Sequence, residues 1–176
     1  NKWYDETFVK RFTDFPLLVR TDTLKRLRAH EVFPGYSSDL SPNGPSVKIQ
    51  GFTEEQHAKL GDYVIWDRKK NGPAAVTRDD VGETIAKKGL DPSLEGTFKI
   101  KLGDGKDVEV ATLWTLYQAH LEDFDLDTVA EITHAPKNMI EQLARDIGTI
   151  KPVAIHQGEG INHWFHATEM NRASYL

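Results

Sequence analysis

The sequence of 176 residues contains no cysteine. This absence excludes disulfide bonds, zinc sites built on thiolates and cysteine-bound iron–sulfur clusters within these residues. Long apolar runs are also missing, because no stretch approaches the roughly 20 residues that a membrane-spanning helix needs. No basic segment followed by an apolar one stands at Asn1, so the sequence shows no signal peptide.

An excess of basic residues is lacking too. The formal net charge is −5 at pH 7, which gives no support for nucleic-acid binding, since that needs a neutralising basic surface. Hydrophobic residues make up 39% of the chain and charged residues 28%. These fractions are typical of a globular domain, and the length is sufficient to bury a core.

The two ends do not resemble those of a complete protein. The chain lacks an initial methionine and stops at Leu176, within a segment whose pattern predicts a helix. We therefore expect a piece of a longer polypeptide, with a processed small protein as the alternative.

The pattern of residues divides the chain into three parts. Residues 1–51 contain a predicted helix with Tyr4, Phe8 and Phe12 on one face, a short buried strand at 16–19, a capped turn or short helix at 22–27 and a loop rich in proline and glycine. Residues 52–111 are β-rich. Residues 112–176 alternate helix and strand, which makes the predicted fold class α/β.

The β-rich part contains two predicted strand pairs. Residues 63–66 and 74–76 flank a turn signal at 70–73. The clearer hairpin joins 97–102 to 107–111, because both segments alternate apolar and polar residues around Gly-Asp-Gly. We expect this hairpin to lie at the periphery, with one packed and one solvated face.

Two helices and a strand are predicted in the last part. The first helix carries an apolar stripe from Leu113 to Phe124, and the second begins near Pro136 and continues to Ile147. A strand at 152–157 then leads into a glycine loop and a final helix, which together resemble half of a Rossmann-like sheet. The acidic residues between 122 and 127 predict a solvated helix end and an N-cap rather than a calcium loop. Basic residues at 26, 28 and 68–70 are expected on the surface.

The segment from Gln157 to His166 holds the candidate site. Glycine at 158 and 160 lets the backbone approach a diphosphate closely, and the N-terminus of the following helix favours phosphate. The alternative is an ordinary turn between a strand and a helix. Polar and aromatic side chains around the glycines complete the candidate binding set, which comprises Gln157, Gly158, Glu159, Gly160, Asn162, His163, Trp164 and His166.

Several of these side chains suit a polar ligand. The amide and imidazole groups of Asn162 and His163 can donate hydrogen bonds, and the indole of Trp164 can shield a ligand from water. A zinc site that uses His156, His163 and His166 is the less favoured alternative. No metal ligand and no catalytic residue is assigned, and a buried, hydrogen-bonded histidine remains an alternative for each imidazole.

The Gly-x-Gly-x-Asn-His-Trp-Phe-His segment resembles the corresponding segment of the catalytic alpha subunits of respiratory nitrate reductases and nitrite oxidoreductases, which belong to the dimethyl-sulfoxide-reductase family of molybdenum enzymes. Residues 9–19 resemble the family's junction of helix, Thr-Asp, proline and strand. Residues 129–133 and 139–145 resemble its helix pair, a pattern shared by many molybdopterin oxidoreductases. The family's His/Cys cluster motif is missing here, and its molybdenum-binding aspartate lies upstream of the matched region.

The resemblance implies part of a molybdopterin oxidoreductase subunit that interconverts nitrate and nitrite by oxygen-atom transfer, with related oxyanions such as selenate, chlorate or perchlorate as alternative substrates. It implies a bis-molybdopterin guanine dinucleotide cofactor against the loop 157–166 and an iron–sulfur cluster held outside these residues. It also implies an iron–sulfur beta subunit, a haem or membrane-anchor gamma subunit, and a membrane-associated complex. A non-catalytic nucleotide-binding or assembly domain is the alternative function.

Overall fold

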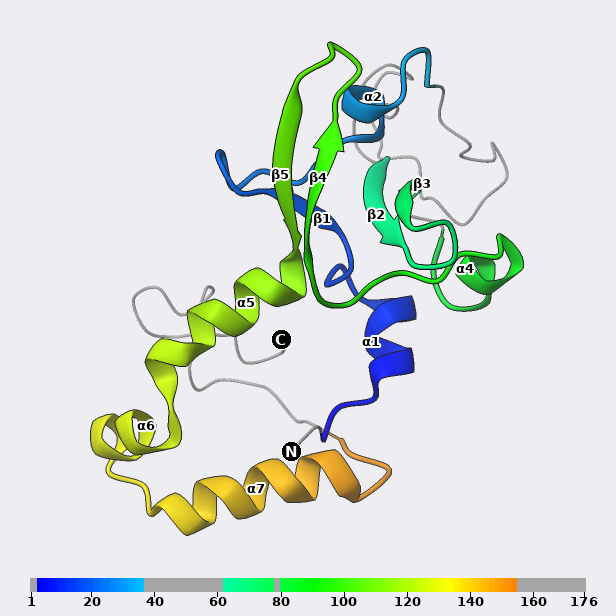
Figure 1. The fold of residues 1–176 in the computed structure, drawn as a ribbon. Helices are drawn as coiled ribbons and strands as arrows, with labels where there is room; N and C mark the ends of the chain where they lie inside the picture. The colour runs from blue at the N-terminus through cyan, green and yellow to red at the C-terminus, as the bar shows by residue number, and fades with distance from the viewer. Residues whose placement is uncertain (1–2, 37–61, 78–79, 155–176) are drawn as a thin grey trace, which may run out of the picture.

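The computed structural model describes residues 3–36, 62–77 and 80–154. Within them the chain is a mixed α/β structure, as predicted from the sequence. Two small antiparallel sheets form one end of the molecule, and the helices after residue 112 extend away from them as an arm (Figure 1).

The first element is helix α1, Glu6–Phe12, which confirms the predicted N-terminal helix. The Asp5 carboxylate caps it by accepting a hydrogen bond from the Phe8 backbone N–H at 3.0 Å. Phe8 and Phe12 stack with a centroid distance of 5.1 Å, on the face that the spacing predicted. Tyr4 lies just before the helix rather than in its first turn.

The predicted hairpin is confirmed as part of a three-stranded sheet. Strands β4, Thr97–Lys101, and β5, Asp107–Thr112, pair antiparallel, and β5 also pairs with β1, Leu18–Arg20, so the order is β1-β5-β4. Ile100 and Val110 are buried whereas Lys99 is exposed, which gives the packed and solvated faces that alternation predicts.

The second sheet pairs β2, Tyr63–Asp67, with β3, Gly72–Val76. Strand β3 begins at Gly72 and includes Pro73, so the turn predicted at 70–73 ends at residue 71. The two sheets are joined by an antiparallel bridge between Leu17 and Ile65 and by the stacked rings of Trp66 and Phe98, whose centroids lie 4.2 Å apart at 6°.

The larger of two hydrophobic clusters in the described residues joins segments far apart in the sequence. Some of its buried members lie in the first third of the chain, and the others lie in β2, β4 and β5. They are Leu18, Leu27, Ala29, Val32, Val64, Ile100 and Val110. Between β1 and the short helix α2, Ala29–Val32, a turn at 21–23 covers only the start of the segment 22–27, and Arg26 then forms an isolated bridge with Val19, so the predicted short helix is absent. The ranges 1–51 and 52–111 therefore share a core where the structure describes them, and their division remains a prediction.

The arm begins directly after β5. Helix α5, Leu113–Leu121, is capped by Thr112 and continues into a 3-10 turn, Glu122–Phe124. The N-terminal half of α5 packs on the core, because the Trp114 ring lies 4.9 Å from those of Phe15 and Tyr4.

Helices α6, Leu126–Thr133, and α7, Lys137–Thr149, complete the arm. The Asp125 carboxylate caps α6 by accepting from the Thr128 N–H at 2.7 Å, which confirms that the acidic run ends in an N-cap. The two helices predicted for this part correspond to α5 and α7, and both are present. Pro136 is the N-cap of α7. A separate short helix, α4, Glu83–Lys87, lies between β3 and β4.

The sheets of the described residues are antiparallel. Of the strand predicted at 152–157, only Pro152–Ala154 is described, and these residues pair with no other strand. The rest of that strand, the glycine loop and the final helix lie outside the described residues, as does most of the loop predicted up to residue 51.

Candidate functional site

The loop predicted to bind a cofactor lies entirely outside the described residues. This applies to all eight candidates: Gln157, Gly158, Glu159, Gly160, Asn162, His163, Trp164 and His166. Their assignment therefore remains a prediction from the sequence. The described chain leads to this loop through α7 and residues 150–154.

A groove lined largely by polar side chains lies between β1 and α2. It is open to solvent, with a volume of about 690 Å³, and its lining includes the charged residues Arg20, Lys25, Arg26, Arg28 and Glu31 together with His30. A second, smaller hollow of about 370 Å³ shares three of these residues and continues toward the tip of the β4–β5 hairpin.

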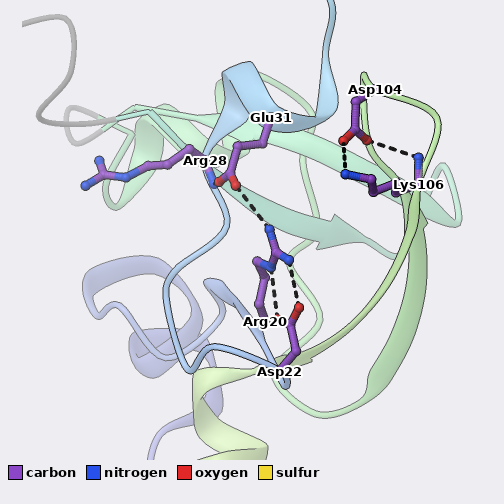
Figure 2. A network of polar contacts seen from close by, with 6 residues as sticks. All are labelled: Arg20, Asp22, Arg28, Glu31, Asp104 and Lys106. Carbon is purple, nitrogen blue, oxygen red and sulfur yellow. Dashed lines mark hydrogen bonds and ion pairs between the residues drawn. The ribbon is translucent and has the colours of Figure 1, made fainter.

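Arg20 is the centre of this groove (Figure 2). Its guanidinium donates to both carboxylate oxygens of Asp22, at 3.0 and 2.7 Å, and reaches Glu31 Oε1 at 3.5 Å. The hydrogen bonds with Asp22 raise the pKa of Arg20 and lower the pKa of Asp22, because each favours the charged form. Glu31 also accepts from the Arg28 backbone N–H at 2.8 Å and so ties the network to the start of α2.

Two further guanidinium groups lie over one aromatic ring. The Cζ atoms of Arg26 and Arg28 are 4.8 and 4.4 Å from the centroid of the Tyr63 ring. Arg26 and Arg28 flank the buried Leu27, so their side chains leave the extended backbone on the same side. A bridge between Arg28 and Tyr63 places this segment beside the start of β2. Arg26 also binds Asp14 at 3.1 Å. Arg26 is exposed as predicted, whereas Arg28 is half-buried.

This groove can attract and orient an anion, but it lacks the parts of a catalytic centre. Asp22 and Glu31 already neutralise much of the charge of Arg20, and the lining contains no nucleophile paired with a base. Among residues 3–36, 62–77 and 80–154, no three histidine or acidic side chains gather as metal ligands do. The described residues thus form a scaffold with a polar surface rather than a reaction site.

Three buried aspartates, Asp62, Asp67 and Asp80, were not singled out from the sequence, and the last two bind backbone N–H groups. Asp67 is completely buried, and its Oδ1 accepts from the backbone N–H groups of Lys69 and Asp91 at 3.2 and 3.0 Å. The side chain of Asp80 accepts from the Thr77 N–H at 2.8 Å and pairs with Lys88. An aspartate directly before a turn is the sequence signal of such backbone-binding side chains, and Asp67 has it. Both residues stabilise loops.

Comparison with known proteins identifies the relatives of this chain. No family model matches it. It is 32% identical over 99% of its length to the perchlorate reductase subunit alpha of Dechloromonas aromatica, and 32% identical over 98% to the respiratory nitrate reductase subunit alpha of Haloferax mediterranei. The dimethylsulfide dehydrogenase subunit alpha of Rhodovulum sulfidophilum is 25% identical over 93%.

The chain spans a small part of these relatives, 19% of the perchlorate reductase subunit and 16% of the nitrate reductase subunit. Within its described part, no helix is both long and apolar enough to cross a membrane. Over nearly its whole length, this chain is therefore homologous to one segment of the alpha subunits of oxidoreductases.

Proposed function

We propose that this chain is a segment of the catalytic alpha subunit of a molybdenum-dependent oxidoreductase that acts on an inorganic oxyanion, in the dimethyl-sulfoxide-reductase family. The observation that carries the proposal is the 32% identity, over 98–99% of the chain, to alpha subunits named perchlorate reductase and respiratory nitrate reductase. The mixed α/β fold and the lack of a reaction site among the described residues agree with a supporting segment of such a subunit.

Within this class, we propose nitrate and nitrite as the substrate pair. The support is the Gly-x-Gly-x-Asn-His-Trp-Phe-His segment, which resembles that of nitrate reductases and nitrite oxidoreductases, together with the nitrate reductase relative. The perchlorate relative is equally identical, so perchlorate and chlorate are the competing substrates that an experiment must separate.

The proposed cofactor is bis-molybdopterin guanine dinucleotide, which when bound supplies the oxygen-atom exchange at molybdenum. The donor set of the loop fits it by its chemistry. Glycine at 158 and 160 leaves room for backbone N–H groups beside a phosphate, and Asn162 and His163 offer neutral donors to a pterin. Trp164 would exclude water, while Gln157, Glu159 and His166 would line the edge of the pocket.

The proposed partners follow from the same relatives. Each is named a subunit alpha, so each acts with other subunits. For this protein we propose an iron–sulfur beta subunit that carries electrons, and a haem or membrane-anchor gamma subunit. The iron–sulfur cluster of the alpha subunit would be bound outside these residues, since they contain no cysteine.

Metal analysis and a substrate panel on the natural protein test this proposal. We expect molybdenum together with iron, and a kcat/KM for nitrate reduction or nitrite oxidation at least tenfold above that for perchlorate and chlorate. A preference for perchlorate would retain the oxyanion class and overturn the nitrate assignment. A protein with bound nucleotide but neither metal would instead be the non-catalytic nucleotide-binding domain.

A further inference from the structure

The turn that follows β1 presents a leucine to solvent. Leu24 is 72% exposed, more than any other large apolar side chain in the described ranges. Its backbone has a φ of +54°, in the left-handed region that glycine, asparagine and aspartate adopt most readily. A leucine in this conformation is strained, and no burial of its side chain offsets the strain. Strained residues of this kind are concentrated at functional sites.

Backbone hydrogen bonds hold this turn in one conformation. The Leu24 N–H donates to the Arg20 carbonyl oxygen at 2.9 Å, and the Arg20 N–H donates to the Lys25 carbonyl oxygen at 2.9 Å. The N–H and the hydroxyl group of Thr21 both donate to the carbonyl oxygen of Glu109 on β5, at 3.1 and 3.2 Å. The sheet therefore fixes the position from which Leu24 projects.

Cationic side chains lie beside this leucine. Leu24 belongs to the lining of the groove between β1 and α2, which has a volume of about 690 Å³. The positively charged residues of the same lining are Arg20, Lys25, Arg26 and Arg28. Figure 2 shows the Arg28 side chain directed away from Arg20, so positive charge is spread along the groove. An exposed apolar side chain among several cations suits a surface that carries carboxylates around an apolar group.

We propose that the part of the groove formed by Leu24, Lys25, Arg26 and Arg28 docks an acidic segment of another subunit. Carboxylates of that segment would meet the two guanidinium groups, and an apolar side chain between them would pack on Leu24. A preformed turn loses little conformational entropy on binding, so its fixed geometry favours association. The inference rests on the proposed function only in requiring a second subunit.

The two ends of the molecule suit different neighbours. The arm exposes apolar side chains such as Met139 and Leu143, whereas α2 and the groove lie at the opposite end (Figure 1). Apolar faces suit the interior of one polypeptide, because unpaired charges are costly to bury there. Charged surfaces with a single apolar anchor are typical of contacts between separately folded proteins, which keep a polar rim around a few buried side chains. A single leucine would anchor only weakly in a lipid surface.

Photo-crosslinking in the natural complex tests the docking site. Benzoylphenylalanine in place of Leu24 should link to another subunit, at a peptide that contains two or more aspartates or glutamates. The matched control is the same probe in place of Lys87, which is exposed on α4 and does not line the groove, and its yield should be at least tenfold lower. The inference is overturned by a link within the same polypeptide, to a second copy of it, to lipid or to a peptide without acidic residues, and equally by no link at all.

Dissociation of the complex on dilution, followed by mass photometry, is the second measurement. Leu24→Gly removes the apolar anchor and suits a positive φ, so the urea midpoint should not fall while half-dissociation moves to a concentration at least tenfold higher. Lys25→Glu should also weaken the complex at least tenfold, because it places a negative charge against the acidic segment. Lys87→Glu makes the same charge change on α4 and should shift half-dissociation less than twofold. Unchanged dissociation in Leu24→Gly and Lys25→Glu would overturn the inference.

The docking site and the proposed function fail separately, because neither measurement reads molybdenum content or turnover. A cross-linked complex without molybdenum would retain the docking site and overturn the proposed function. A molybdenum enzyme in which the probe at residue 24 forms no link to another subunit would do the reverse.

Discussion

At the scale of single residues, buried carboxylates near the two sheets fix loops by accepting hydrogen bonds from backbone N–H groups. Asp67 shows this most clearly, because it terminates β2 with no exposed surface and binds two backbone N–H groups from separate loops. Its other oxygen, Oδ2, has no hydrogen-bond partner. One carboxylate oxygen therefore carries the structural role of this residue.

We predict that Asp67→Ala lowers the free energy of unfolding by about 1–3 kcal/mol, the usual cost of leaving such partners unsatisfied. Asp67→Asn should cost less, because its amide oxygen can replace Oδ1 while the unpaired Oδ2 becomes a neutral NH₂ group. Urea unfolding of the three proteins measures the difference. Equal losses in the alanine and asparagine variants would show that charge, rather than the two hydrogen bonds, matters here.

At the scale of elements, the caps of the arm depend on pH. The hydrogen bond from the Thr128 N–H lowers the pKa of Asp125, so the folded protein holds this carboxylate charged more strongly than the unfolded chain does. The resulting stabilisation of α6 is complete above the ordinary aspartate pKa and is lost as the pH falls through the lowered folded value. Asp125 is exposed, so we expect a local effect.

Amide hydrogen exchange along α6 checks this prediction. Protection at Val129 and the residues after it should decrease between neutral and acidic pH in the natural sequence. In Asp125→Asn the neutral amide oxygen can accept the same hydrogen bond at every pH, and protection should stay level. A parallel decrease in both proteins would assign the acid sensitivity to another group.

At the tip of the β4–β5 hairpin, we expect a substitution to have little effect on activity. Asp104 at its tip is exposed and accepts from the Lys106 N–H at 3.0 Å within the turn. Because this contact is local, Asp104→Ala should change kcat/KM of the proposed oxidoreductase by less than twofold, as steady-state kinetics can measure. A large loss of turnover with unchanged unfolding would place the hairpin tip near the substrate.

These elements also show what the sequence could predict. The hairpin, helices α5 and α7 and the Asp125 cap depend on neighbouring residues, so local patterns were sufficient. Leu18 pairs with Thr112, which is 94 positions away in the sequence. The hydrophobic periodicity of a segment does not predict which distant strand it pairs with. For the same reason, it was not expected that the described residues of 1–51 and 52–111 share hydrophobic clusters. The loop 157–166 was proposed from its motif, and that proposal is still to be tested by mutation.

At the scale of the whole molecule, the sheets and the arm differ in how completely they are packed. The sheet end contains the buried core, whereas α6 and α7 contain no buried residue. Helices with large exposed apolar faces gain most of their stability from tertiary packing. The arm is thus the part that depends on surroundings supplied by the rest of the protein.

For the proposed oxidoreductase, we predict that Gly160→Val lowers molybdenum content at least fivefold, because a branched side chain would take up space that the proposed cofactor needs. His163→Ala should reduce turnover at least tenfold. His30→Ala is the matched control, because His30 is exposed in the polar groove and should tolerate the change. Metal analysis and kinetics of the three variants are the measurements. Full molybdenum and normal turnover in Gly160→Val would make the loop purely structural.

Trp3 and Gly148 are in contact, so the chain between them, about 145 residues long, forms a closed loop without a covalent link. The arm is the last part of this closed loop. Figure 1 shows the start of the described chain, just before α1, beside the C-terminal half of α7, while α5 connects to the sheets at the other end of the arm. The entropy cost of closing a ring grows only with the logarithm of its length. A few glycines inserted between α6 and α7 should therefore be tolerated, whereas a bulky side chain at 148 would open the ring and release the arm as a tethered chain.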